Sequence, residues 1–92
     1  MNSTPPWTIH VARSVERQLA RLVPKDQQLI RAALVQLAAD PRSIDLKRLE
    51  GHLTGARLRV GNWRLLLDVE PEQRLFAVRA LKRRTSTTYR KR

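Results

Sequence analysis

One segment constrains the fold more than any other, because residues 57–69, with the sequence RLRVGNWRLLLDV, predict a β-hairpin. Apolar and charged side chains alternate through most of the segment, and the Gly61-Asn62 connection is typical of a two-residue hairpin turn. In such a turn the flanking residues pair directly, so Val60 faces Trp63 and the register of both strands follows. The second half of the chain is therefore expected to form antiparallel sheet.

This register separates the hairpin side chains into an apolar face and an arginine face. The apolar face carries Leu58, Val60, Trp63 and Leu65, and the other face carries Arg57, Arg59 and Arg64. Arg59 lies directly opposite Arg64, and like charges in that arrangement destabilise a sheet. The arginine face therefore predicts an anionic ligand.

The other segments predict the order β-α-α-β-β-β. Residues 7–11 alternate as a half-buried strand does. Two helices with apolar stripes follow, one from Ser14 to Pro24 and one from Lys25 to Asp40, and residues 42–54 are a connector. We expect one α+β domain over residues 1–92, in which a small antiparallel sheet packs against an N-terminal helical hairpin.

The last strand is expected to extend the arginine face. A four-residue turn at residues 70–73 pairs Val69 with Arg74, and the same register sets Trp63 opposite Ala80. Arg79 then lies beside Arg64 on the arginine face. Trp63 falls on the core side, so burial is its expected role.

The charge of the chain favours a polyanionic partner. It has 19 Lys and Arg against 8 Asp and Glu, a net charge of +11. Residues 1–50 carry 8 basic and 5 acidic side chains, whereas residues 51–92 carry 11 basic and 3 acidic ones. Arginine predominates, and its planar fork suits phosphate. Nucleic acid is the favoured partner.

Several classes of protein do not fit. There is no cysteine, His10 has no second histidine or carboxylate at ligand spacing, and His52 is expected to be solvated, so no metal and no other cofactor is expected. The first residues lack the pattern of a signal peptide, and no apolar run reaches membrane-spanning length. A cytoplasmic protein without a membrane partner is expected.

Taken together, these features resemble the RelE/ParE toxin superfamily. The resemblance rests on the element order, on Leu49-Glu50-Gly51, on the hairpin segment, on Lys82-Arg83-Arg84 and on Tyr89. It covers nearly the whole chain and is most specific in the hairpin. RelE-like members cut mRNA in the ribosomal A site, ParE-like members poison DNA gyrase, and both are neutralised by a cognate antitoxin, so the resemblance implies such a partner here.

The resemblance also implies roles for individual residues. RelE-like nucleases use a sheet-face arginine after the hairpin turn, a basic cluster after the last strand and an aromatic near the C-terminus. The implied catalytic residues are Arg64, Lys82, Arg83 and Tyr89. The implied RNA-binding residues are Arg57, Arg59, Arg79 and Arg84. The ribose 2′-hydroxyl attacks the adjacent phosphate without a metal, so fixed cations such as Arg64 and Arg83 must meet the developing charge.

The general base is not assigned by these matches. The family often has lysine, glutamate or histidine at the position that Arg57 occupies, and arginine stays protonated. Lys82 and Tyr89 remain as candidates, and each would have to release its proton far more readily than it does in water. Three functions stay open: an mRNA endonuclease, which is favoured, a gyrase inhibitor without nuclease activity, and a non-catalytic basic RNA-binding module.

Overall fold

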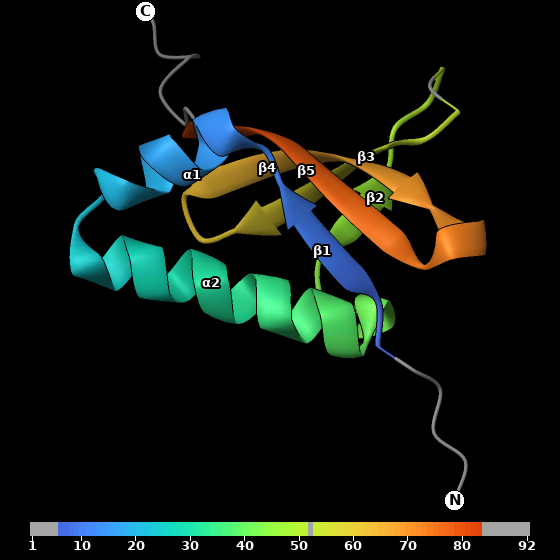
Figure 1. Ribbon diagram of the computed structural model, residues 1–92, viewed down its shortest axis with the longest axis horizontal. Coiled ribbons are helices and arrows are strands. Elements are labelled where there is room, and N and C mark those ends of the chain that lie inside the picture. The colour runs from blue at the N-terminus through green and yellow to red at the C-terminus, as the bar shows by residue number, and fades with distance from the viewer. Residues whose placement is uncertain (1–5, 52, 84–92) are drawn as a thin grey trace, which may run out of the picture.

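The computed structural model describes residues 6–51 and 53–83, which form a layer of sheet packed against a layer of helices (Figure 1). The elements are β1 (Thr8–Val11), α1 (Arg13–Ala20), α2 (Pro24–Ala39), the 3-10 helix η1 (Pro41–Ser43), β2 (Leu46–Arg48), β3 (Gly55–Val60), β4 (Trp63–Glu70), the 3-10 helix η2 (Pro71–Gln73) and β5 (Leu75–Arg83). The sheet has the strand order β1-β5-β4-β3-β2. The α+β class and the helical hairpin are therefore confirmed.

Two features of the sheet differ from the prediction. The segment predicted as a connector contains β2, a three-residue strand that pairs antiparallel with β3 and places Lys47 opposite Arg57. At the other edge β1 runs parallel to β5, so the sheet is mixed. A strand as short as β2 shows too little alternation to be recognised, and periodicity carries no information about strand direction.

The predicted hairpin is confirmed residue by residue. Val60 pairs with Trp63 and Arg59 with Arg64. Gly61 has a φ of 56°, which only glycine adopts readily in a two-residue turn. A Cβ at this position would also lie 3.0 Å from Cδ2 of Leu29, so the tip of the hairpin rests against α2.

The predicted register between β4 and β5 is wrong. Val69 pairs with Phe76 rather than Arg74, and Trp63 pairs with Arg83 rather than Ala80. The turn occupies Pro71 to Arg74, one residue later than predicted, because η2 ends at Arg74 in the left-handed conformation with a φ of 50°. The turn alone moves the pairing by two residues.

A β-bulge in β5 causes the remaining shift. Leu67 pairs with Val78 and Leu66 pairs with Ala80, so Arg79 is the extra residue. Side chains point alternately to the two faces of a strand, and the bulge reverses this alternation. Val78 before the bulge and Leu81 after it are therefore both buried, and Lys82 points away from the core.

The core lies between the helices and the apolar face of the sheet. Its fully buried side chains include Leu19 of α1, Leu37 of α2 and Leu65 of β4. Trp63 is buried, as predicted. Pro24, predicted to close the first helix, is instead the first residue of α2, where its missing N–H costs nothing.

Candidate nucleic-acid interface

We call the side of the sheet that faces away from the helices the outer face. Three neighbouring strands each place a cation there at the same level. Arg59 of β3 lies directly opposite Arg64 of β4, which lies directly opposite Lys82 of β5. All three side chains are exposed. We call Arg59, Arg64 and Lys82 the cation row.

The cation row is packed with like charge. Directly opposite residues in an antiparallel pair have Cβ atoms roughly 4.5–5.5 Å apart, a distance at which like charges destabilise the sheet. Within residues 6–51 and 53–83 there are three ion pairs, Arg31–Glu16, Arg57–Asp45 and Arg79–Asp68, and none includes a member of the row. The row therefore has the charge and the accessibility that an anion needs.

Arg57 occupies the next position along β3 on the outer face, between Lys47 and Leu66. Only 13% of its side chain is exposed, and its Nη1 lies 3.7 Å from Oδ1 of Asp45. That nitrogen is buried and has no hydrogen-bond acceptor within the described residues. A guanidinium held in this way is positioned by its surroundings.

Arg79 does not lie beside Arg64, contrary to the prediction. The bulge turns its guanidinium toward Asp68, where Nη1 donates to Oδ2 at 3.1 Å and to Oδ1 at 3.3 Å. The hydroxyl of Thr54 donates to the same carboxylate at 2.9 Å. The position opposite Arg64 belongs to Lys82 instead, because the longer turn shifts the register of β5 by two residues and the bulge shifts it by one more.

Arg83 is also placed differently from the prediction. Its guanidinium lies 4.6 Å from the centroid of the Trp63 ring, in a cation–π contact. Trp63 is buried on the helix side, so Arg83 lies on that side of the sheet while Arg64 lies on the outer face. The expected pair of Arg64 and Arg83 is therefore not assembled in this arrangement.

Comparison with protein-family models gives no match, and neither does comparison with curated proteins. Solved structures do match. A chain of the archaeal RelE–RelB complex from Pyrococcus horikoshii has a TM-score of 0.76 at 20% identity, covering 88% of this chain and 98% of that one. The isolated RelE toxin of E. coli has a TM-score of 0.71 at 16% identity, covering 90% of each chain. The chain has the RelE toxin fold.

A third structure with the RelE fold supports this assignment. The toxin–antitoxin complex RelBE2 from Mycobacterium tuberculosis contains a chain with a TM-score of 0.67 at 25% identity, covering 86% of this chain and 99% of that one. The matches extend over nearly the full length of those chains. The described residues therefore contain the sheet and helical hairpin that RelE toxins share.

Relative to this RelE fold, the predicted site residues divide into three groups. The outer face brings together Arg57, Arg59, Arg64 and Lys82. Arg79 lies on the same face but is held away from the cation row by Asp68, and Arg83 lies on the helix side against Trp63. Arg84 and Tyr89 lie outside the described residues.

One outer-face residue was missed at the sequence level, Asp68, which holds Arg79. Lys47, expected to extend the basic surface, lies directly opposite Arg57. The signal for Asp68 is a lone carboxylate within the apolar run of residues 65–69, at a parity that points it outward. The described residues contain no group of three His, Cys, Asp or Glu that could hold a metal ion, and none of their helices is long and apolar enough to span a membrane.

Proposed function

We propose that the chain is the toxin of a type II toxin–antitoxin system and that it cuts ribosome-bound mRNA without a metal. The observation that carries this proposal is the cation row, three exposed cations at one level of the outer face, none of them in an ion pair with a described residue. Such a row lowers the stability of the sheet. A phosphodiester at the row would remove that cost.

The proposed chemistry needs charge stabilisation more than anything else. The ribose 2′-hydroxyl attacks the adjacent phosphorus, the bond to the 5′-oxygen breaks, and a 2′,3′-cyclic phosphate and a 5′-hydroxyl result. Negative charge develops on the phosphate oxygens, where fixed donors that need no reorganisation are most effective. Arg64 is flanked by a cation on each side, so it is our choice for the contact to the scissile phosphate.

Binding of the RNA backbone and proton transfer are assigned to other residues. Arg59 and Arg57 follow one another on the outer face of β3 and would hold the RNA backbone. Lys82 and Tyr89 remain the candidates for proton transfer. The roles of Arg83 and Arg84 in catalysis and RNA binding stay predictions.

The proposed partners are mRNA on the ribosome and a cognate antitoxin. The matching structures from P. horikoshii and M. tuberculosis are complexes of a toxin with its antitoxin. An antitoxin segment with acidic side chains would meet the same outer face, because the row presents positive charge without a carboxylate of its own. Neutralisation by such a segment would block RNA from the row.

Primer extension on ribosome-bound mRNA tests the proposal. Wild-type protein should produce cuts with 2′,3′-cyclic phosphate ends, and Arg64→Ala should reduce the rate by roughly 10²- to 10³-fold, as loss of one preorganised donor does in other enzymes. Arg17→Ala, which removes an exposed arginine from α1, is the matched control and should leave the rate unchanged. Inhibition of gyrase supercoiling without any RNA cleavage would favour the ParE-like alternative, and salt-dependent RNA binding without cleavage would favour a non-catalytic module.

A further inference from the structure

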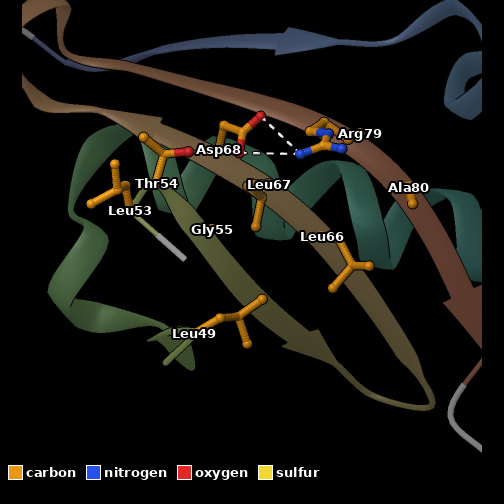
Figure 2. Close-up of a pocket in the computed structure, with 9 residues that line it drawn as sticks. All are labelled: Leu49, Leu53, Thr54, Gly55, Leu66, Leu67, Asp68, Arg79 and Ala80. Carbon is orange, nitrogen blue, oxygen red and sulfur yellow. Dashed lines mark hydrogen bonds and ion pairs between the residues drawn. The ribbon is translucent and has the colours of Figure 1, made fainter. Parts of the chain in front are cut away.

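The outer face carries a pocket beside the cation row (Figure 2). Its volume is about 420 Å³, within the range of about 300–1,000 Å³ typical of small-ligand sites. Its lining residues are Leu49, Leu53, Thr54, Gly55, Leu66, Leu67, Asp68, Arg79 and Ala80. We call it the Leu66 pocket.

The floor of the Leu66 pocket is apolar although it lies on the charged side of the sheet. Leu66 and Ala80 are directly paired across β4 and β5 and are only partly buried, since neither α1 nor α2 covers this face. Leu53 at the rim is 94% exposed. An apolar platform open to solvent among arginines is unfavourable by itself and suits a flat apolar ligand with polar edges, such as a nucleobase.

The wall of the pocket offers both a hydrogen-bond acceptor and a donor. The Asp68 carboxylate has about four acceptor positions, and it accepts three hydrogen bonds from Thr54 and Arg79. One position on Oδ2 is therefore left over. The guanidinium of Arg79 is fixed beside it and is 65% exposed, so its other N–H groups can donate to a ligand.

The pocket lies within one nucleotide of the cation row. Leu66 is two residues from Arg64 on β4, a separation of about 7 Å along a strand. Leu66 is also directly opposite Arg57, and Arg57 is two residues from Arg59 of the cation row on the same face of β3. A phosphate on the row would therefore place its own or the adjoining base over the Leu66 pocket.

We propose that the Leu66 pocket holds the nucleobase beside the phosphate on the cation row and selects bases that carry an exocyclic amino group. This inference rests on the proposed function, because it takes RNA as the ligand of the outer face. The free acceptor position of Asp68 receives the amino group, as carboxylates do from cytosine N4, while Arg79 donates to a ring nitrogen or carbonyl. Adenine, cytosine and guanine have an amino group and uracil has none, so uracil is disfavoured.

Binding of short, uncleavable 2′-O-methyl oligonucleotides tests the selection, because cytosine has an amino group at C4 and an acceptor at N3, whereas uracil has a carbonyl at C4 and a donor at N3. By fluorescence anisotropy the wild-type protein should bind the cytidine oligomer about tenfold more tightly, the discrimination expected of a good hydrogen-bonded pair. Asp68→Asn should remove this preference. Glu70→Gln makes the same charge change on β4 outside the pocket and should keep the preference.

Two further variants distinguish a loss of base selection from a folding defect. Ala80→Phe fills the Leu66 pocket from β5 without changing charge and should lower the affinity for the cytidine oligomer to that for the uridine oligomer. Arg64→Ala should weaken binding of both oligomers by the same factor and leave their ratio intact. Equal affinity of the wild-type protein for both oligomers, or a preference that persists in Asp68→Asn, would overturn the assignment.

Failure of the proposed function gives a different result. If ribosome-bound mRNA is not cut while the cytidine preference and its loss in Asp68→Asn are observed, the nuclease proposal is wrong and the base pocket stands. A pocket that receives an antitoxin side chain instead would show no preference between the oligomers. Ala80→Phe would then weaken antitoxin binding alone, and the base assignment would be overturned.

Discussion

The cations at the two ends of the outer face differ in whether a carboxylate lies beside them. Near the hairpin turn, Arg59, Arg64 and Lys82 stand at one level, and none is in an ion pair with a described residue. Farther along the sheet, Arg57 and Arg79 each have a carboxylate, at 3.7 Å and 3.1 Å. The cations near the hairpin turn can therefore bind an anionic ligand, whereas Arg57 and Arg79 are held in position by their carboxylates. Composition alone would count all five as equivalent.

The largest expected effect comes from a residue that the bulge between these two ends turns inward. Unbroken alternation after Val78 would leave Leu81 on the outer face, whereas the bulge buries it in the core. Leu81→Ala should therefore lower the free energy of unfolding by about 2–5 kcal/mol. Urea denaturation measures this loss. A variant as stable as the wild type would contradict the role given to the bulge.

A smaller effect, on the cleavage rate, should distinguish the cation row from the arginine that is paired with Asp68. Lys82→Ala should lower the cleavage rate by roughly 100-fold, because it removes a candidate for proton transfer next to the reacting phosphate. Arg79→Ala should leave the rate on cytidine-containing sites within about tenfold of wild type, since it affects only base contacts. The measurement is single-turnover cleavage on the ribosome. Equal losses in the two variants would remove the distinction between the two ends.

The salt dependence of RNA binding should distinguish the same residues without any catalysis. For single strands the slope of log K against log salt changes by about 0.7 for each phosphate contact. Arg59→Ala should therefore reduce the magnitude of the slope by about 0.7, and Arg79→Ala should leave it nearly unchanged because its charge is already neutralised by Asp68. Titrations of a fluorescent oligonucleotide at several salt concentrations provide the slopes.

The smallest expected effect concerns stability. Arg64→Thr relieves repulsion with both neighbours and should raise the free energy of unfolding by about 0.2–1 kcal/mol at low salt. The gain should shrink as salt is added, because exposed charges are screened. Arg17→Thr on α1 is the control and should show no such gain. A destabilised Arg64→Thr protein would mean that the row is neutralised in the free state.

The hairpin was predictable because its information is local. A glycine at the turn and alternation on either side determine which residues pair, and Arg57, Arg59 and Arg64 share a face as a direct consequence. Nothing beyond the segment itself is needed. The side of the sheet on which Trp63 lies follows from the same register.

The last strand was not predictable in the same way because its register depends on events outside the local pattern. The left-handed Arg74 lengthens the turn, and the bulge at Arg79 reverses the alternation. The sequence carries a sign of the bulge, since the apolar positions change from even to odd between Val78 and Leu81. The shorter turn and the unbroken alternation of the prediction together moved Arg79 to the position of Lys82 and hid the pairing of Lys82 with Arg64.

The contact between Arg83 and Trp63 also gives the molecule an intrinsic optical reporter. The indole is next to Arg64 in sequence and lies 4.6 Å from the guanidinium of Arg83, so its emission is sensitive to the charge on either side of the sheet. The only other tryptophan is Trp7, which precedes the edge strand β1 and is stacked on Phe76. In a Trp7→Phe protein, fluorescence alone would follow the arrival of a polyanion in real time, without a label on either partner.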